Sequence, residues 1–110
     1  MAAQNILFAT GKTTLLKPSF KSLDAVGDVL KQYPDLKLDI DGYTDNTGKA
    51  DKNLALSQGR ADAVKTYFTG KGIAADRIAA TGHGQDNPIA DNKTAKGKAK
   101  NRRVEMKVKY

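Results

Sequence analysis

The sequence contains no cysteine, no tryptophan and only one histidine, and aromatic residues make up 6% of it. The absence of cysteine excludes a disulfide framework, a thiol nucleophile and a Cys-ligated zinc site. The single histidine, His83, cannot supply the several ligands of a usual zinc site. It stands between two glycines, which predicts a structural role in a turn. No apolar run approaches the roughly 20 residues of a membrane-spanning helix, so the composition argues against a membrane-spanning chain.

Familiar catalytic and cofactor motifs are also absent from the sequence. The segment Gly11-Lys12-Thr13 resembles the end of a phosphate-binding loop, but Ile6 occupies the position of the required first glycine. Asp39 and Asp41 share one side of a predicted strand, and aspartates on the exposed face of a strand are more often solvated than catalytic. No Ser-His-Asp arrangement is indicated. We therefore expect no catalytic residue, no metal site and no cofactor.

The length of 110 residues corresponds to one domain, and we expect residues 1–110 to form it. The net charge of +7 is distributed unevenly. Residues 1–92 contain eleven basic and eleven acidic side chains, whereas residues 93–110 contain eight Lys or Arg and a single acidic residue, Glu105. This basic region can attract nucleic acid, anionic lipid or a carboxylate-rich polymer. It can equally be a well-solvated surface, and composition leaves both interpretations open.

The beginning of the sequence does not have the features of a signal peptide. Residues 1–4 lack a charged segment and are not followed by a long apolar stretch. The sequence is therefore expected to be either a cytosolic protein or a domain of a longer exported protein.

The spacing of apolar residues predicts alternating strands and helices. The short apolar run at residues 6–9 indicates a strand. Pro18 suits the first position of a helix, which ends before Pro34. Strict alternation at residues 36–41 indicates a strand with one buried face. The remaining predicted elements are a polar loop at 42–48, a long helix from about 52 to 70, a strand at 78–81, one or two helical turns within 91–100 and a terminal strand at 103–110.

The order of the predicted elements indicates the fold class. The order is β-α-β-α-β-β, which favours a two-layer α/β (α+β) sandwich. We expect a mixed four-stranded sheet with helices on one face.

The predicted long helix carries polar residues beside its apolar stripe. The stripe consists of Leu54, Ala61, Val64 and Phe68. Asn53, Ser57 and Arg60 are spaced i, i+4 and i+7, so they share one side of the helix. Arg60 borders the apolar stripe, and we expect its side chain to be half-buried at the edge of the core.

Asp45 lies in the loop just before this helix, where backbone N–H groups converge. An aspartate can receive an ammonium group, and an arginine can bind a carboxylate with two hydrogen bonds. Asp45 and Arg60 together would therefore suit a zwitterionic ligand. The alternative is that Asp45 and Arg60 pair with each other, or that Asp45 caps a turn.

An ordered set of motifs extends over nearly the whole sequence. Its members are Gly42–Gly48 (GYTDNTG), Asn53–Ala61 (NLALSQGRA), Gly72-Ile73, Arg77-Ile78, Gly82-His83-Gly84, Asn87–Ala90 (NPIA), Asn92-Lys93-Thr94 and Asn101–Glu105 (NRRVE). Each motif is weak by itself, but the ordered set is specific. Together the motifs closely resemble the OmpA-like peptidoglycan-binding domain of bacterial cell envelopes, the domain type of the OmpA C-terminal region, Pal and MotB.

The resemblance implies a β-α-β-α-β-β fold that binds the cell wall noncovalently and without catalysis. The implied ligand is the meso-diaminopimelate of the peptide stem, whose side chain ends in an ammonium and a carboxylate. By position, Asp45 would hold the ammonium and Arg60 the carboxylate. Thr44 and Asn53 would add hydrogen bonds, and Arg102 would close the site from the last strand. The parity of that strand places Arg102 on the side that faces the helices.

Three positions depart from the family pattern. Ala9 follows Phe8 where the family often has Asp, so one hydrogen bond to the ligand is expected to be missing. Tyr43 replaces the commoner His before Thr-Asp, and Lys98 stands where the family often has Arg. These departures bear on ligand preference more than on the fold.

The resemblance also implies a location and a set of partners. It implies a soluble domain in the periplasm, belonging to an outer-membrane protein or lipoprotein and tethered to the outer membrane by other parts of that protein. Peptidoglycan is then the expected partner, and nucleic acid is not. The alternative function is polyanion binding through residues 93–110, but the low aromatic content offers few stacking platforms for bases.

Overall fold

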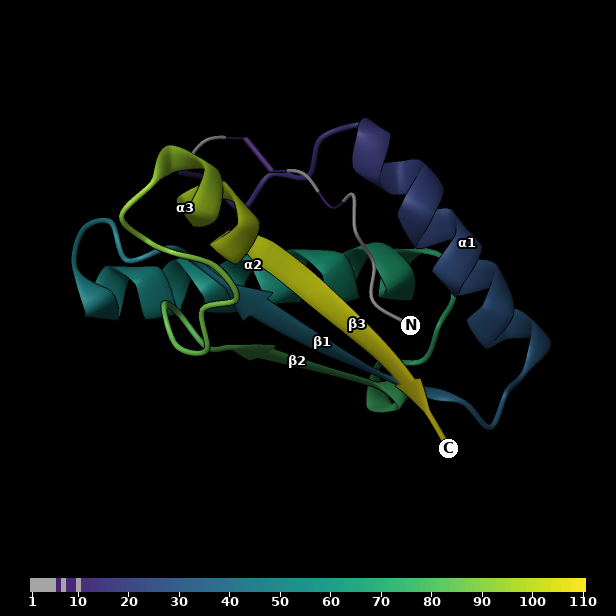
Figure 1. The fold of residues 1–110 in the computed structure, drawn as a ribbon. Helices are drawn as coiled ribbons and strands as arrows, with labels where there is room; N and C mark the ends of the chain where they lie inside the picture. Colours follow the sequence, from purple (N-terminus) through teal and green to yellow (C-terminus); the bar gives the residue numbers. More distant parts are fainter. Residues whose placement is uncertain (1–5, 7, 10) are drawn as a thin grey trace.

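The computed structural model describes residues 6, 8, 9 and 11–110. Its helices are α1 (Pro18–Gln32), α2 (Ala50–Gly70) and α3 (Ala95–Asn101), with one 3₁₀ turn, η1 (Ala75–Arg77), and its strands are β1 (Lys37–Tyr43), β2 (Ile78–Gly82) and β3 (Arg103–Lys109) (Figure 1). Within this part of the chain, no helix combines the length and apolarity needed to cross a lipid bilayer.

The sheet is mixed, with β1 in the centre. β1 pairs in parallel with β2 and antiparallel with β3, in the order β2-β1-β3. A parallel pair needs a long crossover, and α2 supplies it. Leu38 and Ile40 of β1 are fully buried, as is Met106 of β3 at 1% exposure. The alternating Asp39 and Asp41 lie on the opposite face, which is polar.

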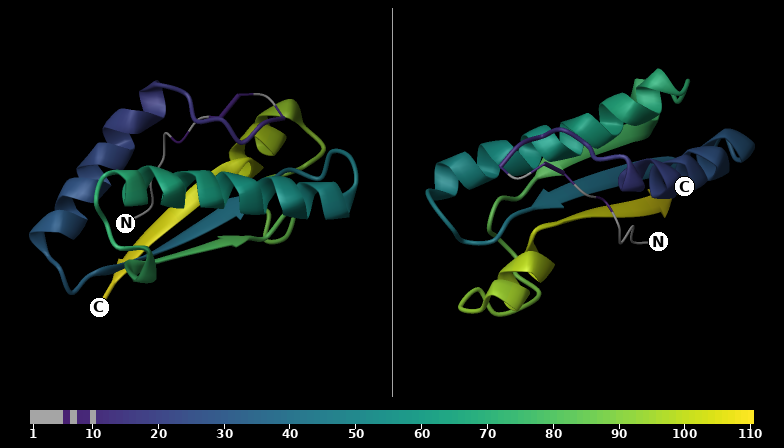
Figure 2. Two further views of the ribbon diagram at one scale, coloured as in Figure 1. Left: turned by 180° about the vertical axis from the view of Figure 1, so that it is seen from behind. Right: turned by 90° about the horizontal axis from the view of Figure 1, so that it is seen from above.

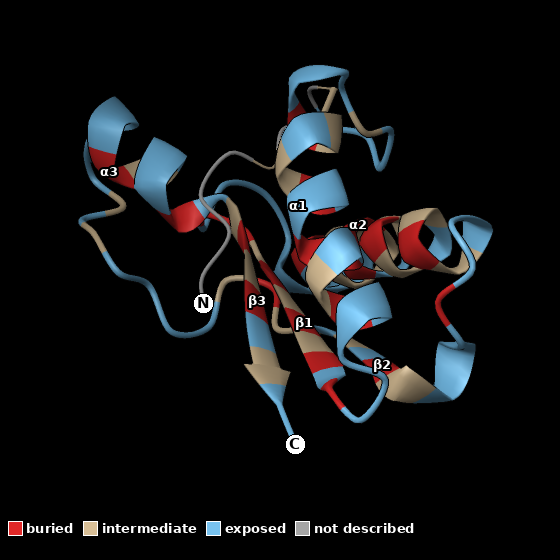
Figure 3. Cartoon of the chain, turned by 90° about the vertical axis from the view of Figure 1, so that its right-hand side faces the viewer, coloured by how far each residue is buried: buried red, intermediate tan, exposed pale blue. Residues whose placement is uncertain are grey.

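Helices α1 and α2 cover one face of the sheet, and the other face is open (Figure 2). The short helix α3 lies beyond the end of the sheet where β1 ends and β3 begins (Figure 1). Buried residues lie where α1 and α2 face the strands (Figure 3). The buried hydrophobic core comprises Leu23, Val26, Leu30, Leu36, Leu38, Ile40, Ala61, Val64, Phe68, Ile73, Ile78, Val104 and Met106.

Arg77 of η1, which follows α2 in the sequence, holds the connection between α1 and β1. α1 begins at Pro18, as predicted, because proline has no N–H to leave unpaired in a first turn. At the other end, the Arg77 guanidinium donates hydrogen bonds to the carbonyls of Leu30, Tyr33 and Leu36. The bond to Leu30 satisfies a carbonyl in the last turn of α1, where helical partners are lacking, and the bonds to Tyr33 and Leu36 hold the turn before β1.

The predicted α+β class and mixed sheet are confirmed, but the predicted four strands and the β-α-β-α-β-β order are not. Among the described residues the sheet has three strands. Leu7, inside the predicted first strand, lies outside those residues. Phe8 forms only an isolated antiparallel bridge with Leu15. The reason is local: the Ala9 N–H bonds to the Thr14 carbonyl (3.0 Å), so this segment folds back on itself.

The backbone of α2 rests directly on two facing glycines of the sheet. Gly42 of β1 and Gly82 of β2 are register partners. A Cβ atom on Gly42 would lie 2.4 Å from the Ser57 carbonyl oxygen, and one on Gly82 would lie 2.2 Å from the Gln58 nitrogen. Only glycine permits so close an approach. The side of α2 that faces the sheet therefore differs from the predicted apolar stripe. Ser57 is fully buried, whereas Leu54, predicted to lie in the stripe, is 50% exposed.

Gln58 also closes the outer edge of the sheet. Its side-chain amide donates to the Ala80 carbonyl (3.0 Å), and its amide oxygen accepts from the Gly82 N–H (2.8 Å). A side chain of α2 thus takes the place of a neighbouring strand along β2. An edge strand with satisfied backbone groups is protected against pairing with another chain.

The glycine contact predicts a large cost for one added methyl group. Gly82→Ala should lower the free energy of unfolding by about 2 kcal/mol, because the new methyl group meets backbone atoms that cannot rotate away. Gly70→Ala, at the end of α2, is the matched control, since a Cβ atom there has no neighbour within 4 Å. Urea denaturation of both variants checks this expectation. Equal stability of the two variants would contradict the close packing of α2 on the sheet.

Candidate functional site

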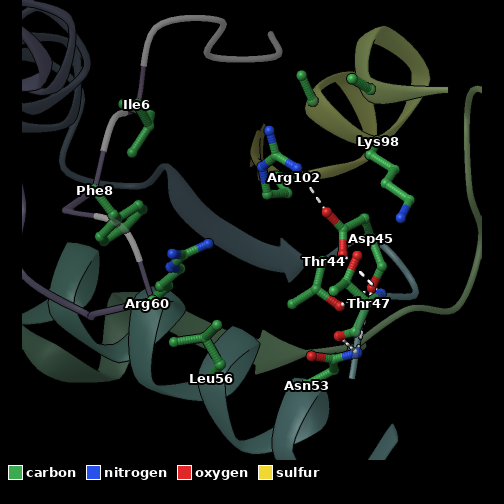
Figure 4. A pocket seen from close by; sticks show the side chains of 13 residues that line it. Ile6, Phe8, Thr44, Asp45, Thr47, Asn53, Leu56, Arg60, Lys98 and Arg102 are labelled. Atoms are coloured by element: carbon green, nitrogen blue, oxygen red, sulfur yellow. Dashed lines mark hydrogen bonds and ion pairs between the residues drawn. The ribbon is translucent and has the colours of Figure 1, made fainter. Parts of the chain in front are cut away.

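A pocket of about 790 Å³ opens where the end of β1, one side of α2 and one side of α3 meet. Its volume lies within the range typical of small-molecule sites. Four segments form its walls: the N-terminal segment, the loop after β1, α2, and α3 with the residue that follows it. The lining residues are Ile6, Phe8, Gly11, Thr44, Asp45, Thr47, Asn53, Leu56, Arg60, Ala95, Lys98, Ala99 and Arg102 (Figure 4).

The loop after β1 presents the only carboxylate among these lining residues, that of Asp45. The Thr47 N–H donates to Asp45 Oδ1 at 2.9 Å, and the Thr44 hydroxyl donates to the Asp45 carbonyl at 2.8 Å. The Thr44 N–H bonds to the Gly84 carbonyl (2.7 Å), which continues the contact between the ends of β1 and β2. Asp45 is therefore fixed at the pocket wall and is only 7% exposed.

Asn53, in the first turn of α2, ties this loop to the helix. Its side-chain nitrogen lies within hydrogen-bond distance of the Asp45 carbonyl (3.3 Å), the Thr47 carbonyl (3.0 Å) and Gln85 Oε1 (3.2 Å). The resemblance implied a hydrogen bond from Asn53 to a ligand. In this structure the amide nitrogen already serves the loop, so Asn53 acts first as a positioning residue for Asp45.

Arg60 crosses from α2 to the N-terminal segment. Its Nε donates to the Lys12 carbonyl at 3.0 Å, and its guanidinium carbon lies 5.1 Å from the centre of the Phe8 ring. The residue is 9% exposed, so it is more deeply buried than the expected half-burial at the core's edge. The outer end of its guanidinium points into the pocket (Figure 4).

Arg102 enters the pocket from the opposite side and forms an ion pair with Asp45. Arg102 Nη1 lies 2.6 Å from Asp45 Oδ2. The preceding residue, Asn101, is fully buried and holds the loop before α3. Its Oδ1 accepts from the N–H groups of Ile89 and Ala90. This buried amide positions the junction from which Arg102 extends.

The electrostatics of the pocket follow from these contacts. Burial by itself raises the pKa of Asp45, but hydrogen bonds from Thr47 and Arg102, with the charge of Arg102, outweigh burial and lower it overall. Burial lowers the pKa of Arg60, and the neighbouring charge of Arg102 lowers it further, while Asp45 acts in the opposite sense. At neutral pH the carboxylate is ionised, and two guanidinium charges act on each other across the pocket.

The structure brings all five predicted site residues to one pocket; they are Thr44, Asp45, Asn53, Arg60 and Arg102. Their roles toward a ligand remain predictions. The ion-pair partner of Asp45 is Arg102, not the Arg60 of the alternative interpretation. The other alternative, in which Asp45 caps a turn, is confirmed by its bond from the Thr47 N–H.

Sequence reasoning missed the groups that hold Arg60 and the junction of α3. The Lys12 carbonyl and the Phe8 ring come from a segment about 50 residues away, and no local pattern connects them to Arg60. Asn101 was part of a quoted motif but received no role. Its position directly before two arginines is the signal that could have found it.

The positions that depart from the family pattern have different surroundings. Lys98 lines the pocket from α3. Tyr43 lies on the open face of the sheet, where its ring stacks on His83 with centroids 4.9 Å apart and contacts the Arg103 guanidinium at 3.8 Å. Ala9 belongs to the folded-back N-terminal segment. The loss of one ligand hydrogen bond, expected because Ala9 replaces the family's Asp, stays a prediction.

The basic residues at 93–110 do not share one surface. Lys98 and Arg102 line the pocket. Arg103 bonds to Glu105 (2.7 Å), and Lys109 pairs with Asp39 (2.9 Å), both on the open face of the sheet. This division removes two of the eight positive charges from any common patch, so the polyanion interpretation gains no support.

Asp39, Asp41 and His83, which the sequence analysis considered for catalysis or metal binding, each pair with a neighbouring side chain. Asp39 pairs with Lys109, and Asp41 Oδ1 lies 2.8 Å from His83 Nε2. In the part of the chain that the structure describes, no group of three or more His, Asp or Glu side chains gathers as a metal-binding cluster.

Comparison with known sequences identifies the family of this chain. The sequence pattern of the OmpA family matches residues 7–102. The chain belongs to the OmpA family. The peptidoglycan-binding protein ArfA of Mycobacterium tuberculosis H37Rv is 46% identical over 103 residues, which are 94% of this chain and 32% of that protein. The probable lipoprotein YiaD of Escherichia coli K12 is 46% identical over 102 residues, 93% of this chain and 47% of YiaD. This OmpA-family chain thus spans about a third to a half of the length of these curated relatives.

Solved structures of the family share the fold. The peptidoglycan-associated lipoprotein from Burkholderia pseudomallei superposes with a TM-score of 0.88 at 27% identity, covering 94% of this chain and 88% of that one. A MotB-like protein from Desulfovibrio vulgaris gives a TM-score of 0.84 at 31% identity, covering 94% and 67% of the two chains.

The lowered pKa of Asp45 predicts a pH-dependent contribution to stability. A carboxyl whose pKa is lower in the folded state stabilises that state fully above its unfolded pKa, about 3.9, and loses the contribution as the pH falls through the folded value. Asp45→Asn should therefore cost about 1 kcal/mol at pH 7 and progressively less below about pH 4. Urea denaturation of wild type and variant across this range measures the difference. A cost that does not change with pH would contradict the ionised pairing of Asp45 with Arg102.

Proposed function

We propose that this chain binds bacterial peptidoglycan noncovalently and that the pocket between α2 and α3 receives the zwitterionic end of a meso-diaminopimelate side chain in the stem peptide. One observation supports this proposal above the others: an ionised Asp45 and an inward-pointing Arg60 line the same pocket from different elements. A ligand that carries an ammonium and a carboxylate on one carbon complements this pair.

Each of the five residues has a role in the proposal. Asp45 accepts a hydrogen bond from the ammonium, and Arg60 donates to the carboxylate. Arg102 contributes a second guanidinium from the opposite wall. Thr44 and Asn53 line the wall beside Asp45 and hold its loop through the contacts described above.

The proposal is for binding without catalysis, by residues 1–110 as one module of a larger envelope protein. Relatives whose names denote peptidoglycan binding or a lipoprotein support this placement. So does a porin: outer membrane porin F of Pseudomonas fluorescens is 38% identical over 104 residues. We propose that the module lies in the periplasm and anchors the outer membrane to the cell wall through other parts of its parent protein.

Disruption of either central charge-assisted hydrogen bond should weaken binding to the cell wall. Arg60→Lys should lower affinity for purified sacculi about tenfold or more, and Asp45→Asn should lower it by a smaller, measurable factor, since each weakens a charge-assisted hydrogen bond to the ligand. Arg60→Lys keeps the positive charge but loses the planar fork. Co-sedimentation with sacculi measures the bound fraction.

The control for these variants is Asp39→Asn, which removes an aspartate from the open face of the sheet. Its partner Lys109 is 54% exposed, and neither residue lines the pocket. Asp39→Asn should pellet with sacculi like the wild type, and circular dichroism verifies that all variants are folded. Wild-type pelleting by both Asp45→Asn and Arg60→Lys would contradict the proposed site.

The identity of the ligand can be read from backbone amide shifts. Titration with a meso-diaminopimelate muropeptide should shift the NMR signals of Asp45, Asn53, Arg60 and Arg102. The matching muropeptide with L-lysine as its third residue, which keeps a side-chain ammonium but lacks the side-chain carboxylate, should leave these signals in place. An absence of shifts at about millimolar muropeptide, where a complex worth only about 4 kcal/mol would be half formed, would contradict the proposed ligand.

A further inference from the structure

The charges that face the pocket are unequal in number. Among its described lining residues, Arg60, Lys98 and Arg102 are cationic, and Asp45 alone is anionic. Lys98 extends from α3 toward the space in front of Asp45 (Figure 4). A zwitterion with one positive and one negative group would balance an Asp–Arg pair, but this pocket carries two further positive charges. The surplus favours the negative end of any ligand.

The anionic half of the site is already engaged within the protein. Asp45 Oδ1 accepts from the Thr47 N–H at 2.9 Å, and Asp45 Oδ2 accepts from Arg102 Nη1 at 2.6 Å. Each carboxylate oxygen has a second lone pair, so an ammonium can still bind. It must then share the carboxylate with Arg102, whose like charge opposes it. The gain from the ammonium is correspondingly small.

Arg60, in the cationic half of the site, is held in place by the protein, but it forms no ion pair with a described residue. Arg60 is anchored through Nε to the Lys12 carbonyl and through its face to Phe8. Its Nη atoms make no hydrogen bond with another described residue, and they point into the pocket (Figure 4). A guanidinium whose orientation is fixed by other contacts loses little freedom when it binds a carboxylate.

Like charges on opposite walls add to this preference. Arg60 enters from α2 and Arg102 from the α3–β3 junction, so their positive charges repel each other. Burial is the larger cause of the lowered pKa of Arg60, and the charge of Arg102 is the next. An anion placed between two cations relieves their repulsion as well as binding to each. Loss of the anionic group would leave that repulsion unrelieved in a partly buried site.

We infer that the pocket selects its ligand chiefly by a free carboxylate at the side-chain end of the stem residue, that Lys98 is a further residue for this carboxylate, and that the neighbouring ammonium contributes less. This inference rests on the proposed function. Its chemical consequence is a sensitivity to amidation. Conversion of that carboxylate into a carboxamide removes the negative charge and places an NH₂ donor against three cationic donors. Peptidoglycan amidated at this position would then be a poor ligand.

Four stem peptides that differ only at the side-chain end of their third residue test this inference. The third residue is meso-diaminopimelate, its side-chain carboxamide, L-lysine (no side-chain carboxylate) or 2-aminopimelate (no side-chain ammonium). All four keep the other carboxylates of the stem, so only the selected end varies. Calorimetric titration of the full chain gives the affinity for each peptide. The 2-aminopimelate peptide should bind within about fivefold of the diaminopimelate peptide, and the carboxamide and lysine peptides about tenfold or more weaker.

The outcomes separate this inference from the proposed function. Binding of the diaminopimelate peptide, with 2-aminopimelate as weak as the carboxamide, would overturn the inference and leave the proposed function intact. Binding of the lysine peptide as tightly as the diaminopimelate peptide would do the same. Failure of all four peptides to bind would contradict the proposed ligand, and the inference with it.

A pair of lysine variants tests the assignment of Lys98. Lys98→Met removes the charge and keeps the apolar stem, and Lys100→Met does the same at an exposed position of α3 outside the pocket lining. Lys98→Met should weaken binding of the diaminopimelate and 2-aminopimelate peptides about threefold to tenfold and leave the weak carboxamide affinity unchanged. Lys100→Met should match the wild type. Equal losses in the two variants, or an equal loss for the carboxamide, would overturn the role of Lys98.

Discussion

Backbone contact between α2 and two glycines of the sheet is the constraint on which the rest of the molecule depends. Gly42 and Gly82 face each other on neighbouring parallel strands, and the Ser57–Gln58 backbone lies where their side chains would be. Because nothing separates helix and sheet there, Ser57 and Gln58 bond directly to the backbone of the β2 edge and the turn after it. The same approach brings one side of α2 to the loop after β1, where Asp45 lies.

The pocket is built from charges that the fold holds in place before any ligand binds. Asp45 is fixed by its own loop and by Arg102, and Arg60 by a carbonyl and a ring of the N-terminal segment. Such preorganisation reduces the entropy lost on binding. It also makes the two halves of the site unequal: the Asp45 carboxylate already pairs with Arg102, whereas the Arg60 guanidinium forms no ion pair with any residue that the structure describes. The proposed preference for a free carboxylate follows from that inequality.

Local patterns predicted the helices and central strand well because their signals are local. Pro18 began α1 as expected, and strict alternation marked β1. The four-stranded sheet was not confirmed: among the described residues the sheet has three strands, and Phe8 of the first apolar run forms only an isolated bridge with Leu15. Leu54 was wrongly placed in the core because helical periodicity cannot show that Ser57 meets a glycine pair at that level. The first of these differences arises from a short-range turn of the chain, and the second arises from packing between α2 and the sheet.

The sequence by itself determined the α+β class, the approximate bounds of the described helices and strands, and five of the thirteen residues that line the pocket. Periodicity, prolines and an ordered set of motifs are properties of the chain, so they can be read without coordinates. Only the tertiary structure decided which charges pair. Asp45 and its ion-pair partner Arg102 are 57 positions apart, and Arg60 is 48 positions from Lys12, whose backbone carbonyl accepts its hydrogen bond. Partners at such separations depend on how α2 and α3 are placed against the sheet, because charge pairing is a matter of distance in space and not of position along the chain.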